Sequence, residues 1–130
     1  MNDAKMNNVN QLSDDNPVRV SKFFAARLMN AEINNAQLSR VDFSEASLHG
    51  TAFNSSNLYE AKFTGAKLIN ASLDHANLSR ADFRRANLSG ASLVKADLRG
   101  ANFAEAIVSR EQLMKAVNNE RALRQIGTAK

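Results

Sequence analysis

A large apolar residue recurs at every fifth position through most of this chain, and this period fits neither of the common secondary structures. Starting at Phe23, seventeen consecutive residues at this spacing are Leu, Ile or Phe, and Val18 and Val108 extend the phase by one step at each end. An α-helix buries residues about 3.6 apart, and a half-buried β-strand alternates with a period of two. A strict five-residue period therefore predicts a repeat architecture with a different geometry.

The other positions of the repeat also have a constant character. We call the large apolar residue of each repeat its centre. The residue two before the centre is alanine in every repeat from Ala61 to Ala106, Asn or Asp often precedes the centre, and four of the five glycines stand two residues after it. If each repeat makes one short extended side and one turn, the centre and the small residue point inward. Asn, Asp and Gly then suit the corners, because they bond nearby backbone or accept unusual dihedral angles.

The clearest repeats read Ala76-Asn77-Leu78-Ser79-Arg80, Ala81-Asp82-Phe83-Arg84-Arg85, Ala86-Asn87-Leu88-Ser89-Gly90 and Ala96-Asp97-Leu98-Arg99-Gly100. This pattern resembles the pentapeptide-repeat family, whose consensus is A-(D/N)-L-x-x, and the resemblance covers residues 18–108. It implies an all-β solenoid, a right-handed quadrilateral β-helix with four pentapeptides per coil. Seventeen repeats would then make about four to four and a half coils.

The sequence itself supports four repeats per coil, because this geometry stacks residues twenty apart. Five of the six phenylalanine centres are spaced by twenty, which predicts one continuous ladder of rings inside the rod. The centres sort into four faces: face 1 has Phe23, Phe43, Phe63, Phe83 and Phe103; face 2 has Leu28, Leu48, Leu68, Leu88 and Val108; face 3 has Ile33, Phe53, Leu73 and Leu93; and face 4 has Leu38, Leu58, Leu78 and Leu98. We expect the centres of faces 1 and 4 in particular to form the structural core.

The two ends of the chain depart from the repeat. Residues 1–17 are polar and are predicted to form a flexible tail, with an N-terminal cap built on Val9 and Leu12 as the alternative. Residues 18–108 are the predicted β-helix. Residues 109–127 are predicted to be α-helical, because Ser109 and Gln112 match a capping box.

This C-terminal segment has two interpretations that do not exclude each other: a cap over the last coil, or a dimerisation element of the kind that family members often use. Asn118-Asn119 would divide it into two short helices. Its predicted apolar positions are Leu113, Met114, Val117, Leu123 and Ile126.

Nothing in the sequence predicts an enzyme. The chain has no cysteine, which excludes disulfides, Cys-ligated zinc and thiol nucleophiles. His49 and His75 fall at outward positions on different faces, and neither has another His at ligand spacing. There is no Gly-x-Ser-x-Gly elbow and no phosphate-binding glycine loop. We therefore expect no catalytic residue, no metal and no cofactor.

Charge is the remaining feature that bears on function. The net charge is +4, and four arginines of the C-terminal half form the candidate interaction patch: Arg80, Arg84, Arg85 and Arg99. The register places Arg84 and Arg85 on face 1, and Arg80 and Arg99 on face 4. These arginines are either solvated surface charge or a site for nucleic acid, lipid headgroups or an acidic protein. The rod has no exposed aromatic ladder on which bases would stack.

Three hypotheses of function follow. The first is a non-enzymatic protein-interaction scaffold with an unknown protein partner. The second comes from the resemblance, because some pentapeptide-repeat proteins mimic duplex DNA and bind DNA gyrase, but that role calls for a long acidic dimer and this chain is short and basic. The third is anion or nucleic-acid binding by the basic C-terminal half. No membrane span or secretory signal is recognised, so a bacterial cytoplasmic protein is expected, with a secreted effector as the alternative.

Overall fold

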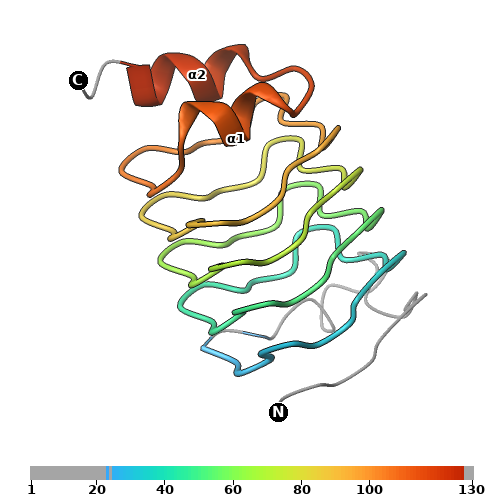
Figure 1. Cartoon of the computed structure of the whole chain (residues 1–130). Helices are drawn as coiled ribbons and strands as arrows, with labels where there is room; N and C mark the ends of the chain where they lie inside the picture. Colours follow the sequence, from blue (N-terminus) through green and yellow to red (C-terminus); the bar gives the residue numbers. More distant parts are fainter. Residues whose placement is uncertain (1–22, 24, 128–130) are drawn as a thin grey trace.

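The computed structural model describes Phe23 and residues 25–127, so the predicted tail and its alternative cap lie outside the described residues. Within this range the chain winds through stacked coils, and two helices lie across one end of the stack (Figure 1). The helices are α1 (Arg110–Met114) and α2 (Glu120–Gly127). The coils are joined by isolated parallel β-bridges, one for each short side.

Residues twenty apart are paired between neighbouring coils, as the sequence predicts. Fourteen parallel bridges with this separation occur among the described residues. Backbone hydrogen bonds accompany them: Phe63 N–H donates to the Asp82 carbonyl at 2.7 Å, and Asp82 N–H donates to the Ala61 carbonyl at 3.0 Å. Four such sides make one coil, so the chain forms a quadrilateral β-helix.

Each corner of the coil is made by the residue two after the centre. At Glu45 this residue has a φ of +61°, and at Gly50 it has a φ of +68°. The corner is closed by a short hydrogen bond, such as the one of 3.1 Å from Ala46 N–H to the Phe43 carbonyl. Positive φ is unfavourable for residues with a Cβ and easy for glycine. This preference explains why glycine recurs at this position of the repeat.

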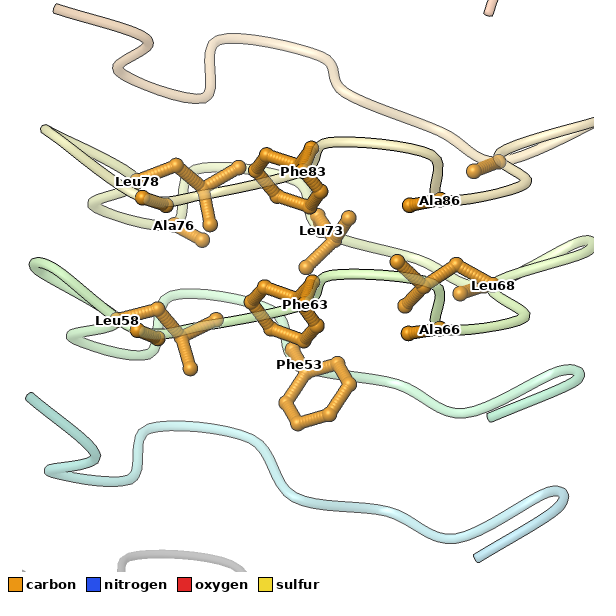
Figure 2. Packing of buried hydrophobic residues seen from close by; sticks show 14 of the residues in the cluster. Phe53, Leu58, Phe63, Ala66, Leu68, Leu73, Ala76, Leu78, Phe83 and Ala86 are labelled. Atoms are coloured by element: carbon orange, nitrogen blue, oxygen red, sulfur yellow. The ribbon is translucent and has the colours of Figure 1, made fainter. Parts of the chain in front are cut away.

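The phenylalanine ladder predicted for face 1 is present in the core. Successive rings from Phe43 to Phe103 are stacked almost parallel, with centroids 4.8–5.2 Å apart, and Figure 2 shows Phe63 and Phe83 one above the other. Phe53, from face 3, meets the rings of Phe43 and Phe63 edge-on. Each aromatic pair contributes about 0.5–1.5 kcal/mol beyond the burial of its area.

The structural-core residues named from the sequence all pack inside the rod, but the first of them is only half-buried. Phe23 packs against the core without full burial. The others are at most 1% exposed: Phe43, Phe63, Phe83, Phe103, Leu38, Leu58, Leu78 and Leu98. The small residue two before each centre from Ile33 to Phe103 is buried as well. Where it carries a hydroxyl, as at Thr51 and Ser56, that hydroxyl donates to a backbone carbonyl at 2.7 Å.

The predicted role of Asn and Asp at the corners is found on three faces. There the side chain before the centre accepts a hydrogen bond from the backbone N–H two residues later, as Asp42 does from Ser44 at 2.8 Å. Face 3 uses a different hydrogen bond at this position, because no Asn or Asp precedes its centres. The acceptor comes from the coil below: Asn54 accepts from Asp74 N–H at 3.0 Å, and Asp74 accepts from Val94 N–H at 2.9 Å.

The predicted capping box begins α1. Gln112 N–H donates to Ser109 Oγ at 3.1 Å, and Ser109 N–H donates to Gln112 Oε1 at 2.7 Å. The division into two short helices around Asn118-Asn119 is also confirmed.

One expectation for this segment needs correction. The twenty-residue register does not stop after Val108, because Leu113 is fully buried twenty residues after Leu93 and Val117 forms a bridge with Asp97. Of the apolar positions of this segment, Met114 and Val117 are 57% and 44% exposed. Helix α1 is one short turn that replaces one side of a coil, and it buries Leu113. Met114 is the next residue and points about 100° away around the helix axis, so it cannot be buried on the same side.

Side chains of the two helices bond the backbone edge of the last complete coil. Phe103 N–H donates to Gln125 Oε1 at 2.7 Å, and the Gln125 amide donates to Asn102 Oδ1 at 2.9 Å. The Gln112 amide donates to the Leu88 carbonyl at 2.6 Å. These bonds hold the two helices against the last complete coil.

Candidate interaction surfaces

The interior of the rod offers no place for a substrate, because its own side chains fill it. His49 is half-buried and His75 is exposed, and they lie on different faces. Among the described residues, no three His, Asp or Glu side chains gather where they could hold a metal ion. None of the helices in the described range is long and apolar enough to cross a membrane. The candidate functional sites of the described residues therefore lie on the outer surface.

The four arginines of the candidate patch are all exposed, but acidic side chains lie beside three of them. Arg84 binds Asp82 through several hydrogen bonds, the shortest 2.7 Å long. Arg80 lies 3.5 Å from Glu60. Arg99 lies close to Asp97, and Arg85 forms no ion pair with another described residue. The patch is thus largely neutralised within the rod.

Neighbouring arginines help to lower the pKa of two carboxyl groups in this region, those of Asp82 and Asp97. Burial raises the pKa of Asp82, but hydrogen bonds from Arg84 and the charge of its guanidinium outweigh burial and hold that pKa below its ordinary value. Burial likewise raises the pKa of Asp97, while a hydrogen bond from Asn118 and the nearby Arg99 lower it overall. A carboxyl with a lowered pKa stabilises the fold above its ordinary pKa, and this contribution disappears as the pH falls through the lowered value.

Arg84→Ala tests whether this pair matters for the fold. We expect the melting temperature at pH 7 to stay nearly unchanged, because the Arg84 guanidinium is exposed and exposed ion pairs contribute little. The pKa of Asp82 should rise towards its ordinary value, which an NMR pH titration of the carboxyl group would measure. A large loss of melting temperature would show that the pair supports the rod.

A ladder of alternating charge runs up the corner that follows face 4. Arg40 Nε lies 2.9 Å from Glu60 Oε1, and Arg80 lies on the other side of the same carboxylate. These residues are twenty apart, so the register alone creates the ladder. Tyr59 adds a contact on each side, with its ring 5.9 Å from the Arg40 guanidinium and its hydroxyl 3.4 Å from Arg80 Nη1. Exposed pairs of this kind contribute little stability.

Face 2 differs from the other faces because it carries no acidic residue. All ten Asp and Glu side chains of the described range lie on faces 1, 3 and 4 or in the two helices. Face 2 carries two exposed cations in one column, Arg27 and Lys67, and neither pairs with another described residue. The sequence interpretation did not single them out, although sorting the charges by face would have found them.

The exposed apolar side chains gather towards the C-terminal end of the rod. Ile107, the next bulky member of the Arg27–Lys67 column on face 2, is 58% exposed. A shallow groove beside it is lined by Ser89, Gly90, Ile107, Val108, Ser109 and Gln112. Met29 and Ile69, each of which follows a centre of face 2, are half-buried. Face 2 thus combines uncompensated positive charge with apolar surface.

Comparison with known proteins agrees with this geometry. The family model described as pentapeptide repeats (8 copies) matches residues 21–58, 56–93 and 81–116. The chain belongs to the pentapeptide-repeat family. Comparison with curated protein sequences returns no match.

Solved structures of pentapeptide-repeat proteins resemble the rod. The crystal structure of alr5209, a pentapeptide repeat protein from Nostoc PCC 7120, is 35% identical and covers 70% of this chain and 74% of its own, with a TM-score of 0.64. The pentapeptide repeat protein Rfr23 from the cyanobacterium Cyanothece 51142 is 22% identical over 83% of this chain and 90% of its own, with a TM-score of 0.38. QnrB1, a plasmid-mediated fluoroquinolone resistance protein, is 19% identical over 88% of this chain and 67% of its own, with a TM-score of 0.46.

Proposed function

We propose that this pentapeptide-repeat rod is a non-enzymatic module that binds a protein partner. The observation that carries the proposal is the contrast between a completely filled interior and flat faces on which outward side chains stand in columns twenty residues apart. Catalysis needs convergent groups in a concave pocket, and no three His, Asp or Glu side chains of the described residues gather where they could hold a catalytic metal ion. Rods of stacked repeats use their extended surfaces for binding.

Affinity capture followed by reconstitution tests this function. The full chain serves as bait in a lysate of its source cells, and an unfolded variant of the same chain serves as the control bait. A partner enriched only by the folded bait should then bind the purified rod in a defined stoichiometry. Failure to reconstitute any such complex, or a chemical turnover that disappears when one surface residue is changed, would refute the proposal.

We assign helices α1 and α2 the role of an end cap on a rod of four to four and a half coils. The hydrogen bonds from Gln112 and Gln125 to the last coil support this assignment. Homodimerisation through the same end is a second candidate, favoured by the exposed side chains of Met114 and Val117. Sedimentation equilibrium of the full chain distinguishes a monomeric capped rod from a dimer.

DNA mimicry is tested separately, and we expect the protein to have no effect on DNA gyrase. A mimic of duplex DNA must present rows of unpaired negative charge, whereas Glu60 here lies between Arg40 and Arg80, and Asp82 is bound by Arg84. Supercoiling by purified gyrase, with and without a fluoroquinolone, should be unchanged at a stoichiometric excess of the rod. Inhibition of the enzyme, or protection from the drug, would restore the mimic hypothesis.

A further inference from the structure

The outward residues of face 2 repeat every two coils rather than every coil. The first and third rows carry Arg27 with Met29 and Lys67 with Ile69, forty residues apart. The second and fourth rows end at Gly50 and Gly90, where a Cβ would overlap the Asn30 or Asn70 amide of the row below. Rows with a cation and an apolar residue therefore alternate along the axis with rows that carry neutral polar side chains, Ser47 with His49 and Asn87 with Ser89.

The groove at the C-terminal end continues this alternation. It lies between the fourth row, at Ser89 and Gly90, and the fifth row, at Ile107 and Val108. Ile107 follows Lys67 by forty residues and so extends the column of bulky side chains. The face offers two free cations, two half-buried apolar residues beside them and an apolar groove at its end.

The spacing of these rows matches an α-helix and not a strand. Neighbouring coils are about 4.8 Å apart, so rows two coils apart are separated by about 9.6 Å. On an α-helix, residues seven apart share one side at about 10.5 Å, a difference that a modest tilt removes. Residues on one side of an extended strand repeat at about 6.6 Å and 13 Å, which misses the rows.

We propose that face 2 binds an amphipathic, acidic α-helix of a partner protein. This inference rests on the proposed protein-binding function and names its surface and the chemistry of its partner. Carboxylates seven residues apart on the partner helix pair with Arg27 and Lys67. Apolar side chains on the adjoining stripe of the helix cover Met29 and Ile69, and the next one enters the groove beside Ile107. Since face 2 has no acidic residue, nothing on it repels such a helix.

A synthetic peptide of three heptads provides the probe. It carries Glu at seven-residue spacing beside a stripe of Leu, and its control carries Lys in place of each Glu. Binding of the labelled peptides to the full-length rod is measured by fluorescence anisotropy at low and moderate salt. We expect the Glu peptide to bind and the Lys peptide not to bind. Equal binding of the two peptides, or no binding of either, would overturn the proposal.

Variants of the rod locate the site. Arg27→Glu with Lys67→Glu should weaken binding of the Glu peptide about tenfold or more, because two attractions become repulsions. Lys95→Glu with Arg99→Glu makes the same change of net charge on faces 3 and 4 and should leave binding within about twofold, as expected for charges outside the contact. Arg27→Gln with Lys67→Gln removes the two charges without reversing them, so it serves as a second variant if the Glu substitutions disturb folding. It should also weaken binding of the Glu peptide.

Other outcomes point elsewhere. A stronger loss of peptide binding in the Lys95→Glu, Arg99→Glu rod than in the Arg27→Glu, Lys67→Glu rod would place the site at the arginine patch. Tight binding of a short DNA duplex that displaces the peptide would favour nucleic acid as the ligand. Both results refute the helix proposal. A partner captured from lysate that binds the Arg27→Glu, Lys67→Glu rod unchanged would refute it too while leaving the protein-binding function intact. The absence of any captured partner would refute the function itself.

Discussion

Phe63→Asp is expected to abolish the folded state of the rod. Phe63 is fully buried and stacks on Phe43 and Phe83 with ring centroids 5.2 Å and 4.9 Å away. Removing a buried Phe side chain costs about 3–5 kcal/mol, and an unpaired buried carboxylate adds to this loss. The sum is comparable to the whole stability of a typical domain, about 5–15 kcal/mol. Circular dichroism and thermal melting should show no cooperative transition for this variant.

Tyr59→Asp is the matched control for this experiment. It also exchanges an aromatic residue for Asp, but Tyr59 lies on the surface between Arg40 and Arg80, where a carboxylate has cationic neighbours. We expect this variant to melt cooperatively, with a stability within about 1 kcal/mol of the parent. Equal damage from both changes would mean that Phe63 is not the centre of a stacked core.

Leu113→Asp is expected to produce the second largest effect, at the C-terminal end. Leu113 is fully buried at the register position that follows Leu93, and α1 contributes no other buried residue. Shortening such a residue costs about 2–5 kcal/mol, and the added charge increases the loss. Once α1 detaches, the backbone edge of the last coil is open to other chains. The variant should melt at a lower temperature and form larger species, seen by light scattering.

The neighbouring residue supplies the control. Met114 belongs to the same helix but is 57% exposed, so Met114→Asp should change the melting temperature little. If Met114→Asp instead converted a dimer to a monomer, the C-terminal end would be a homodimer interface in addition to a cap. Matching losses of stability from the two variants would contradict the register described for α1.

The repeat predicted almost all of the core, because the large apolar residue at every fifth position is the one that points into the rod. The ladder from Phe43 to Phe103 follows from residues twenty apart, and the capping box at Ser109 follows from a local pattern. Helix α1 was harder to place, because a pentapeptide period and a helical period are both compatible with Leu113. Only the contacts of the last coil show that the helix replaces one side of it.

The surface was less accessible to sequence reasoning than the core. Arg84 was interpreted as part of a cationic patch, yet it binds Asp82 two residues away, because alternate residues of an extended segment point to the same side. Arg27 and Lys67 were passed over because they are isolated in the sequence. Their common column, and the absence of carboxylates around them, emerge only when charges are sorted by face.

The twenty-residue register determines which side chains share a face of the rod, and an engineered cysteine pair measures this register most directly. The chain has no cysteine of its own, so an engineered pair has no competing thiols. Ser47 and Lys67 are bridge partners, and the strand spacing of about 4.8 Å lies within the Cα separation that a disulfide allows.

Ser47→Cys with Lys67→Cys should oxidise readily in the native protein. Ser47→Cys with Lys62→Cys, closer in sequence but on different faces, should stay reduced until the chain is unfolded. Preferential oxidation of the second pair in the native state would contradict the register, and with it the faces on which the proposed function depends.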